Sequence, residues 1–125
     1  MRILLDTHVY LWWLDNHPKL SPEARSKIVS ATQVYVSSAS IWEAAIKASL
    51  GKLDVDVNAL VEEIVNSGFL ELPVTVRHAA KVKQLTDIHR DPFDRILIAQ
   101  AICEPLGFLT NDRILKEYSN LVELI

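Results

Sequence analysis

The chain opens with a short apolar run, Ile3–Leu5, that shows no alternation and ends on the carboxylate of Asp6. An apolar run without alternation indicates a strand that is buried on both faces, as in a parallel sheet covered by helices. In sheets of that kind, ligands bind beyond the carboxyl ends of the strands. An acidic residue at this point is therefore either a helix cap or part of a site.

Further short apolar runs alternate with stretches of helical periodicity along the chain. The apolar runs predict strands at about residues 3–5, 34–36, 69–72, 107–110 and 121–125. The periodic stretches predict helices at about residues 7–14, 22–31, 41–50, 58–67, 76–85 and 92–104, with a short helix after Asp112. Strands that alternate with helices in this way are typical of an α/β fold with a mainly parallel sheet.

The composition indicates one domain spanning residues 1–125. The chain is 50% hydrophobic, enough for a substantial core, but its 125 residues leave no room for two domains. No apolar stretch approaches the roughly 18 residues that span a membrane, and the first run does not resemble a signal peptide. The single cysteine, Cys103, excludes an internal disulfide and a cysteine-based metal site. We therefore expect a cytoplasmic protein.

Charge and glycine content narrow the range of functions. The net charge of −3 argues against a protein that coats nucleic acid through bulk charge, but it is compatible with a nuclease whose acidic residues gather around metal ions. The three glycines, Gly51, Gly68 and Gly107, each follow a helical stretch, where glycine commonly ends a helix. Because none has a second glycine nearby, a phosphate-cradling glycine loop is disfavoured.

Four acidic residues follow apolar runs or open helices, and we interpret them as one metal site: Asp6, Glu43, Asp94 and Asp112. Mg²⁺ and Mn²⁺ are hard cations that take oxygen ligands, and Mg²⁺ is usually held by a few carboxylates together with substrate phosphate. No pair of histidines or cysteines at ligand spacing competes for a softer metal. Such a site would suit phosphodiester hydrolysis, which needs an activated water and charge stabilisation at the phosphate.

Each of these carboxylates also has a purely structural interpretation. Asp6 and Asp112 could simply cap the helices that follow them. Glu43 lies three residues after Ser40, the spacing of a capping box. Asp91 precedes Pro92, which favours an N-cap with proline at the first helical position. The acid at position 94 would then lie in the first helical turn, where the helix dipole favours a negative charge.

Four motifs, in this order and over the whole chain, resemble the PIN domain, and most of all the VapC-type toxins with a DPFDR signature. They are Ile-Leu-Leu-Asp-Thr-His at 3–8, Ser-Ala-Ser-Ile-Trp-Glu at 38–43, Asp-Pro-Phe-Asp-Arg-Ile-Leu-Ile-Ala-Gln-Ala at 91–101 and Leu-Thr-Asn-Asp at 109–112. The resemblance implies a three-layer α/β/α fold with four or five mainly parallel strands between helices. It also implies an endoribonuclease dependent on Mg²⁺ or Mn²⁺, usually the toxin of a toxin–antitoxin pair.

The resemblance also implies roles for individual residues. By motif, Asp6, Glu43 and Asp94 match the three central acidic residues of the family, and Asp112 matches the fourth, more variable one. Three supporting positions match as well: Thr7 beside the first aspartate, and Asp91 and Arg95 in the subfamily signature. We expect Arg95 to contact a phosphate or a carboxylate of the antitoxin. The resemblance further implies a homodimer and a small antitoxin that covers the active site.

An RNA substrate requires some positive charge beside the acidic residues. Basic residues near the acidic motifs are candidates, although ordinary solvated helix faces would explain most of them: Arg77, Lys81, Lys83, Arg90, Arg95, Arg113 and Lys116. The adjacent Trp12 and Trp13 hint at a subunit interface, because tryptophan is enriched there. We expect Trp42 to be buried in a core or an interface.

Two other functions are compatible with parts of the sequence. One is a non-catalytic module that uses the same fold to bind RNA or protein, although the presence of all four acids argues against it. The other is a phosphate-transfer enzyme with Asp6 as the nucleophile, as in haloacid-dehalogenase-like enzymes. Those enzymes begin with Asp-x-Asp, whereas His8 stands at the second acidic position here, so this alternative is poor.

Overall fold

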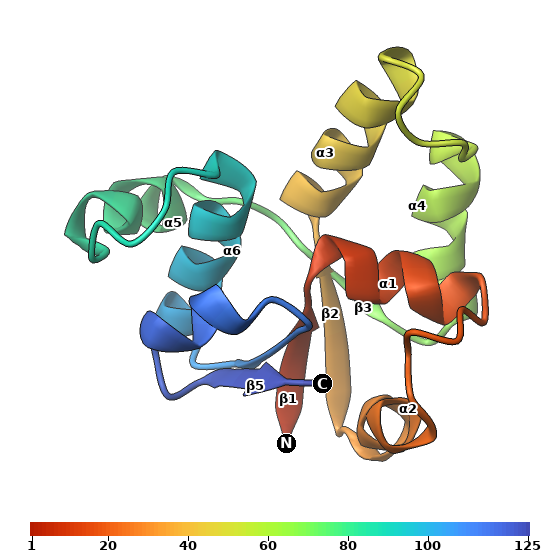
Figure 1. Cartoon of the computed structure of the whole chain (residues 1–125), viewed down its shortest axis with the longest axis horizontal. Helices are drawn as coiled ribbons and strands as arrows, with labels where there is room; N and C mark the ends of the chain where they lie inside the picture. Colours follow the sequence, from red (N-terminus) through yellow and green to blue (C-terminus); the bar gives the residue numbers. More distant parts are fainter.

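The computed structural model describes residues 1–125 and contains one five-stranded sheet. All strand pairs are parallel, in the order β3-β2-β1-β4-β5 (Figure 1). The strands are β1 (Arg2–Leu5), β2 (Gln33–Ser37), β3 (Leu70–Leu72), β4 (Gly107–Thr110) and β5 (Val122–Leu124). These five strands lie where the sequence predicts them, and the prediction of a parallel α/β fold is confirmed.

Six α-helices and two short 3₁₀ helices connect the strands. Their bounds are α1 (Thr7–Leu14), α2 (Pro22–Ser30), α3 (Ser38–Ser49), α4 (Val57–Asn66), α5 (Val76–Lys81), η1 (Val82–Gln84), α6 (Pro92–Cys103) and η2 (Arg113–Glu117). Ser21 and Asp91 cap α2 and α6, each with proline in the first turn, and the cap at Asp91 is one that the sequence predicts. No helix has both the length and the apolar character needed to cross a membrane.

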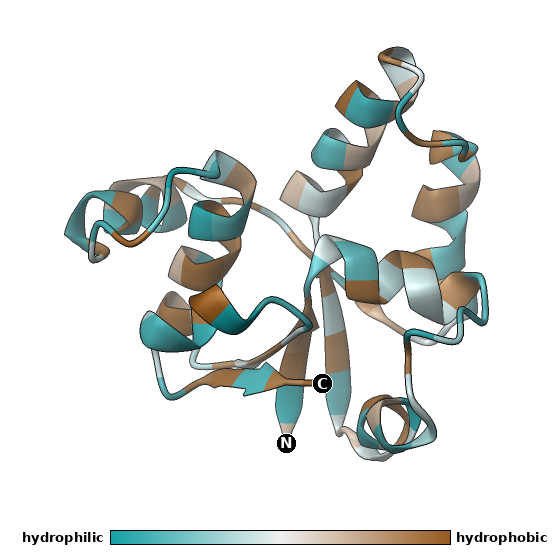
Figure 2. Ribbon diagram, viewed as in Figure 1, coloured by the Kyte–Doolittle hydropathy of each residue, from teal (hydrophilic) through white to brown (hydrophobic).

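The two faces of the sheet carry separate hydrophobic cores, which makes the fold a three-layer α/β/α arrangement. Ile3 and Leu5 of β1 pack on one face with residues of α1, α2 and α4. Leu4 packs on the opposite face with residues of α6, η2 and β5. Beyond Arg2, β1 is accordingly coloured as a hydrophobic segment in Figure 2, whereas β2 shows brown bands between paler ones. Burial on both faces explains why the first apolar run shows no alternation.

The strand order creates a switch point beside β1. The chain passes from β1 outward to β2 and β3, then returns across the sheet to add β4 and β5 on the other side of β1. At the carboxyl end of this pair, the Asp6 backbone N–H donates to the Leu109 carbonyl at 2.9 Å. The segments after β1 and β4 therefore leave the sheet side by side, in the position where open α/β sheets bind ligands.

Several local predictions are wrong. Gly51 and Gly68 have positive φ angles at helix ends, as expected, but Gly107 does not. Instead, a Cβ at Gly107 would lie 2.5 Å from Cε of Met1 and 3.6 Å from Cγ2 of Ile3, so this glycine permits close packing at the start of β4. The helix predicted to start at about residue 58 starts at Val57 and is capped by Asp56.

The helix predicted over residues 76–85 is also different. It consists of the six-residue α5 followed by the 3₁₀ turn η1, and its first residue, Val76, is 85% exposed. The side chain that α5 does bury is His78, whose Nε2 lies 2.7 Å from Oε2 of Glu104. A polar contact to the end of α6, rather than an apolar stripe, thus attaches α5 to the domain.

Candidate active site

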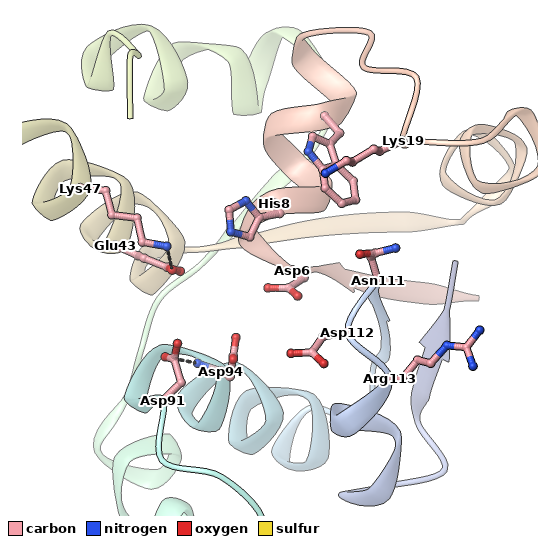
Figure 3. A pocket seen from close by; sticks show the side chains of 11 residues that line it. Asp6, His8, Lys19, Glu43, Lys47, Asp91, Asp94, Asn111, Asp112 and Arg113 are labelled. Carbon is pink, nitrogen blue, oxygen red and sulfur yellow. Dashed lines mark hydrogen bonds and ion pairs between the residues drawn. The ribbon is translucent and has the colours of Figure 1, made fainter. Parts of the chain in front are cut away.

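A pocket of about 610 Å³ lies beyond the carboxyl ends of the strands and is lined almost entirely by polar side chains (Figure 3). We call it the acidic pocket, because five of its lining residues are carboxylates: Asp6, Glu43, Asp91, Asp94 and Asp112. The other lining residues are His8, Trp12, Lys19, Lys47, Asn111 and Arg113. The structure therefore brings together the four acids of the predicted metal site and Asp91.

Asp6 lies at the centre of the acidic pocket, between β1 and α1. Its Oδ1 accepts the Thr7 backbone N–H at 2.7 Å, and its Oδ2 accepts the Thr110 hydroxyl at 2.6 Å. The residue is only 7% exposed, and this burial raises the pKa of its carboxyl group despite both hydrogen bonds. Asp6 is thus a helix cap, as one interpretation held, and at the same time a carboxylate held rigidly in the pocket.

Asp94 enters the acidic pocket from the first turn of α6. Its Oδ2 lies 3.1 Å from Nε2 of His89. Burial, followed by the negative charge of Asp6, raises the pKa of Asp94 from 3.8 to about 6, and the hydrogen bond from His89 only partly opposes this. The negative charges of Asp6 and Asp94 therefore destabilise each other in the protein alone.

Glu43 reaches the pocket from α3, whose first residue is Ser38. The capping-box interpretation is wrong, because Ser37 rather than Ser40 caps this helix. Glu43 instead pairs with Lys47 one turn later, with Nζ and Oε2 2.8 Å apart. The hydrogen bond with Glu43 raises the pKa of Lys47, which keeps the ammonium group charged.

Asp91 and Asp112 combine capping with a place in the pocket wall. Oδ1 of Asp91 accepts the backbone N–H groups of Phe93 and Asp94, at 2.9 and 3.2 Å. Oδ1 of Asp112 accepts the Ile114 backbone N–H at 3.1 Å. In Figure 3 the Asp112 carboxylate points toward the space between Asp6 and Asp94. A capping hydrogen bond to one oxygen leaves the other oxygen of each carboxylate available.

Two supporting residues lie outside the acidic pocket. Thr7 is buried, and its hydroxyl donates to Oγ of Ser40 at 2.9 Å, which joins the start of α1 to α3. Arg95, expected to contact a phosphate or an antitoxin carboxylate, donates instead to the carbonyls of Val82, Thr86 and His89. Its guanidinium therefore secures the loop that precedes α6.

The sequence interpretation did not identify several residues of the pocket. Lys47 has a local signal, since glutamate and lysine four residues apart share a helix face. Lys19, Trp12 and Asn111 have no such signal, because the chain brings them to the pocket from the α1–α2 loop, α1 and the β4–η2 turn. Trp42, predicted to be buried in a core or an interface, lies outside the core of this chain: it is 64% exposed and makes an edge contact with Phe93.

The donor set of the acidic pocket fits a hard divalent cation. Carboxylate oxygens are the ligands that Mg²⁺ and Mn²⁺ prefer, and a cation between Asp6 and Asp94 would relieve their mutual repulsion. Of the lining cations, only Lys47 forms an ion pair with a pocket carboxylate. No three His, Cys, Asp or Glu side chains approach closely enough in this structure to enclose an ion. Asp6, Asp94 and Asp112, with Glu43, are the residues that would hold one.

An acidic pocket at the switch point of an all-parallel sheet defines an α/β protein whose carboxylates gather where folds of this class bind ligands. The model of the PIN domain matches residues 3–121, and the chain belongs to this family. Ribonuclease VapC22 of Mycobacterium tuberculosis is 28% identical over 123 residues, covering 93% of this chain and 91% of that protein.

Solved structures of toxin–antitoxin proteins share the fold. VapBC2 from Rickettsia felis, bound to a DNA fragment from its promoter, superposes with a TM-score of 0.74 at 17% identity, covering 99% of this chain and 98% of the other. A toxin–antitoxin complex from Klebsiella pneumoniae superposes with a TM-score of 0.67 at 15% identity, covering 97% and 95%. The predictions of a PIN-like fold and of the family are confirmed.

Proposed function

We propose that this protein is a metal-dependent endoribonuclease and the toxin of a VapBC-type pair. The observation that carries the proposal is the presence of Asp6 and Asp94 in one acidic pocket, where burial raises the pKa of both carboxyl groups and the charge of Asp6 raises that of Asp94 further. The similarity of this chain to a VapC ribonuclease supports RNA as the substrate. Cytoplasmic location and a homodimer remain predictions that accompany this function.

The chain's own residues prepare the reaction. A Mg²⁺ or Mn²⁺ ion held by Asp6 and Asp94 would polarise the scissile phosphate and lower the pKa of a water nucleophile. Thr110 and the Thr7 backbone N–H fix both oxygens of Asp6, so that its orientation is set before substrate binds. Lys47 engages Oε2 of Glu43, which leaves Oε1 to orient the attacking water.

Two cations on the rim of the acidic pocket are suited to bind the RNA backbone. Lys19 and Arg113 both line the pocket, are exposed, and form no ion pair, whereas Lys47 is engaged by Glu43. Lys19 also places its Nζ 5.7 Å from the centre of the Trp12 ring. Exposed lysine and arginine side chains beside a catalytic pocket attract phosphates and offset its negative charge. We assign the RNA strand to this side of the pocket.

The first test is cleavage of single-stranded RNA by the purified protein. We expect cleavage with Mg²⁺ or Mn²⁺, complete loss with excess EDTA, and recovery when the metal is added back in excess. An Asp6→Asn protein purified in the same way controls for contaminating nucleases. RNA binding without metal-dependent cleavage would contradict the proposal and support a non-catalytic binding module.

We further propose that a small antitoxin protein covers the active site. A second pocket of about 720 Å³ lies between α3, α5 and α6, and seven of its eleven lining residues are hydrophobic, including Trp42, Phe93 and Ile96. Trp42 lines this apolar pocket, and the next residue of α3, Glu43, lines the acidic pocket. The two pockets are therefore adjacent at this point of α3. A basic segment flanked by apolar side chains would complement both pockets together. The toxin–antitoxin assignment of the structural relatives supports such a partner.

Trp42→Ala should weaken antitoxin binding about 10-fold or more, because an exposed tryptophan in an apolar pocket is a typical binding hot spot. The measurement is the affinity for the small protein encoded directly upstream, with RNA cleavage as a control that should stay near the wild-type rate. Val65→Ala, an exposed apolar residue on α4 outside both pockets, is the matched control variant. An unchanged affinity for the Trp42→Ala protein would exclude this surface.

A further inference from the structure

His89 occupies the loop before α6, and its ring bridges Asp94 and Tyr118. On one side, Nε2 lies 3.1 Å from Oδ2 of Asp94. On the other side, Nδ1 lies 2.7 Å from the hydroxyl oxygen of Tyr118, which follows η2. Both ring nitrogens are therefore engaged, and Tyr118 comes from a segment 29 residues away in sequence. Neither His89 nor Tyr118 lines the acidic pocket, so they act on it only through Asp94.

The partners of this ring determine the direction of each hydrogen bond. An ionised Asp94 can only accept, so Nε2 of His89 must donate the proton it carries. In a neutral ring Nδ1 is then the acceptor and takes the proton of the Tyr118 hydroxyl. This distance of 2.7 Å is shorter than the 3.3 Å between the same hydroxyl and its alternative acceptor, the His89 carbonyl. The ring is thus held in one tautomer.

Arg95 begins this chain of hydrogen bonds. Its Nη1 lies 3.1 Å from the Tyr118 hydroxyl oxygen, and a guanidinium can only donate. The Tyr118 oxygen must therefore accept from Arg95, which leaves its own proton for His89. The same Nη1 lies 3.1 and 3.3 Å from the carbonyls of Thr86 and His89, so its two protons are shared among three acceptors and secure the loop that carries the ring. The side-chain hydrogen bonds thus run from Arg95 through Tyr118 and His89 to Asp94, while the His89 backbone N–H also donates to the Tyr118 oxygen at 3.2 Å.

We propose that His89 and Tyr118 are positioning residues that fix the orientation of Asp94 for metal binding. The bond from His89 occupies Oδ2, and no hydrogen bond engages Oδ1, which is left to face the cation. Hydrogen bonds to metal-binding carboxylates orient the ligand, and their loss typically lowers metal affinity about 10- to 100-fold. The inference rests on the proposed function in assuming that Asp94 binds a divalent cation.

The test uses Mn²⁺ affinity measured by titration calorimetry on the RNA-free protein. We expect His89→Ala to weaken binding about 10- to 100-fold, and His89→Gln to recover part of the loss, because its amide can donate to Asp94. Tyr118→Phe should weaken Mn²⁺ binding less, since the His89 ring stays in place and loses only the hydrogen bond from the Tyr118 hydroxyl. Tyr35→Phe is the matched control, because its hydroxyl bonds Gln33 on β2, outside the acidic pocket. Thermal unfolding verifies that each variant is folded.

A second measurement is independent of the metal. The ¹⁵N resonances of the His89 ring should show a protonated Nε2 and an unprotonated Nδ1 in the wild-type protein. Tyr118→Phe should shift them toward a mixture of tautomers, whereas Tyr35→Phe should not. Identical ring spectra in the wild-type and Tyr118→Phe proteins, or wild-type Mn²⁺ affinity in a folded His89→Ala protein, would overturn the inference.

These outcomes separate the inference from the proposed function. A wild-type protein that binds Mn²⁺ and responds to His89→Ala, yet cleaves no RNA, would overturn the function and leave the positioning role intact. A protein that cleaves RNA with Mn²⁺, and whose folded His89→Ala variant binds Mn²⁺ normally, would overturn the positioning role alone. A wild-type protein that binds no Mn²⁺ would overturn both.

Discussion

Asp6→Asn is expected to lower the rate of RNA cleavage at least about a thousand-fold, because the loss of a metal-binding carboxylate removes several kcal/mol of transition-state stabilisation. The fold should persist. The asparagine carbonyl can still accept the Thr7 backbone N–H, and the Thr110 hydroxyl can turn to accept from the new amide. The measurement is the single-turnover cleavage rate at saturating Mn²⁺, with thermal unfolding of the same samples.

Asp15→Asn provides the matched control for this experiment. Asp15 is an exposed aspartate at the end of α1, outside the acidic pocket, so its substitution should leave the cleavage rate unchanged. Asp94→Asn should reproduce the loss seen with Asp6→Asn. If both pocket variants cut RNA at the wild-type rate, the assignment of the site is wrong.

Asp94→Asn is also expected to stabilise the metal-free protein at pH 7, by up to about 3 kcal/mol. This upper limit is the free energy that corresponds to the difference between an ordinary pKa of 3.8 and the value of about 6, and solvent screening of the partly exposed carboxyl group reduces it. Well below pH 3.8 the carboxyl group is protonated in both the folded and unfolded states, and the substitution should change little. As the pH rises from 4 to 6, the unfolded state loses its proton first, so wild-type stability falls relative to the variant. Above pH 6 the difference should be constant.

The measurement is urea unfolding of the wild-type and Asp94→Asn proteins in EDTA at several pH values between 4 and 7. Saturating Mn²⁺ provides the control, because it should stabilise the wild-type protein and remove the advantage of the variant. In an Asp6→Asn background the gain should be smaller, since the charge of Asp6 contributes to the raised pKa of Asp94. A wild-type protein that is as stable as the variant at pH 7 would contradict the mutual repulsion of the two carboxylates.

The parallel fold could be predicted from the sequence because the patterns that indicate each strand and helix are local. Ile3–Leu5 is apolar on both faces, and the proline after Ser21 or Asp91 marks a helix start without reference to distant residues. The meeting of Asp6 with Asp112 also follows from the sequence, because residues after parallel strands emerge at the same edge of the sheet. These features required only periodicity and chain direction.

Other features depend on partners that no local pattern identifies. Arg95 was assigned to a phosphate or an antitoxin, whereas it contacts Tyr118 and carbonyls of the preceding loop. The Ser40–Glu43 spacing fits a capping box, but the competing partner Lys47 and an earlier cap at Ser37 prevail. Val76 fits an inward helix position, yet only the docking of His78 against Glu104 shows which side of α5 is covered.

The return of the chain to the far side of β1 has a consequence for the order in which the pocket forms during synthesis. Asp6 leaves the ribosome well before its hydrogen-bond partner Thr110, which lies 104 positions later in the sequence. A growing polypeptide that has not yet released β4 lacks one wall of the pocket and cannot assemble it. The acidic pocket can therefore assemble only after β4 and the segment that carries Asp112 have been synthesised, however early Asp6 emerges.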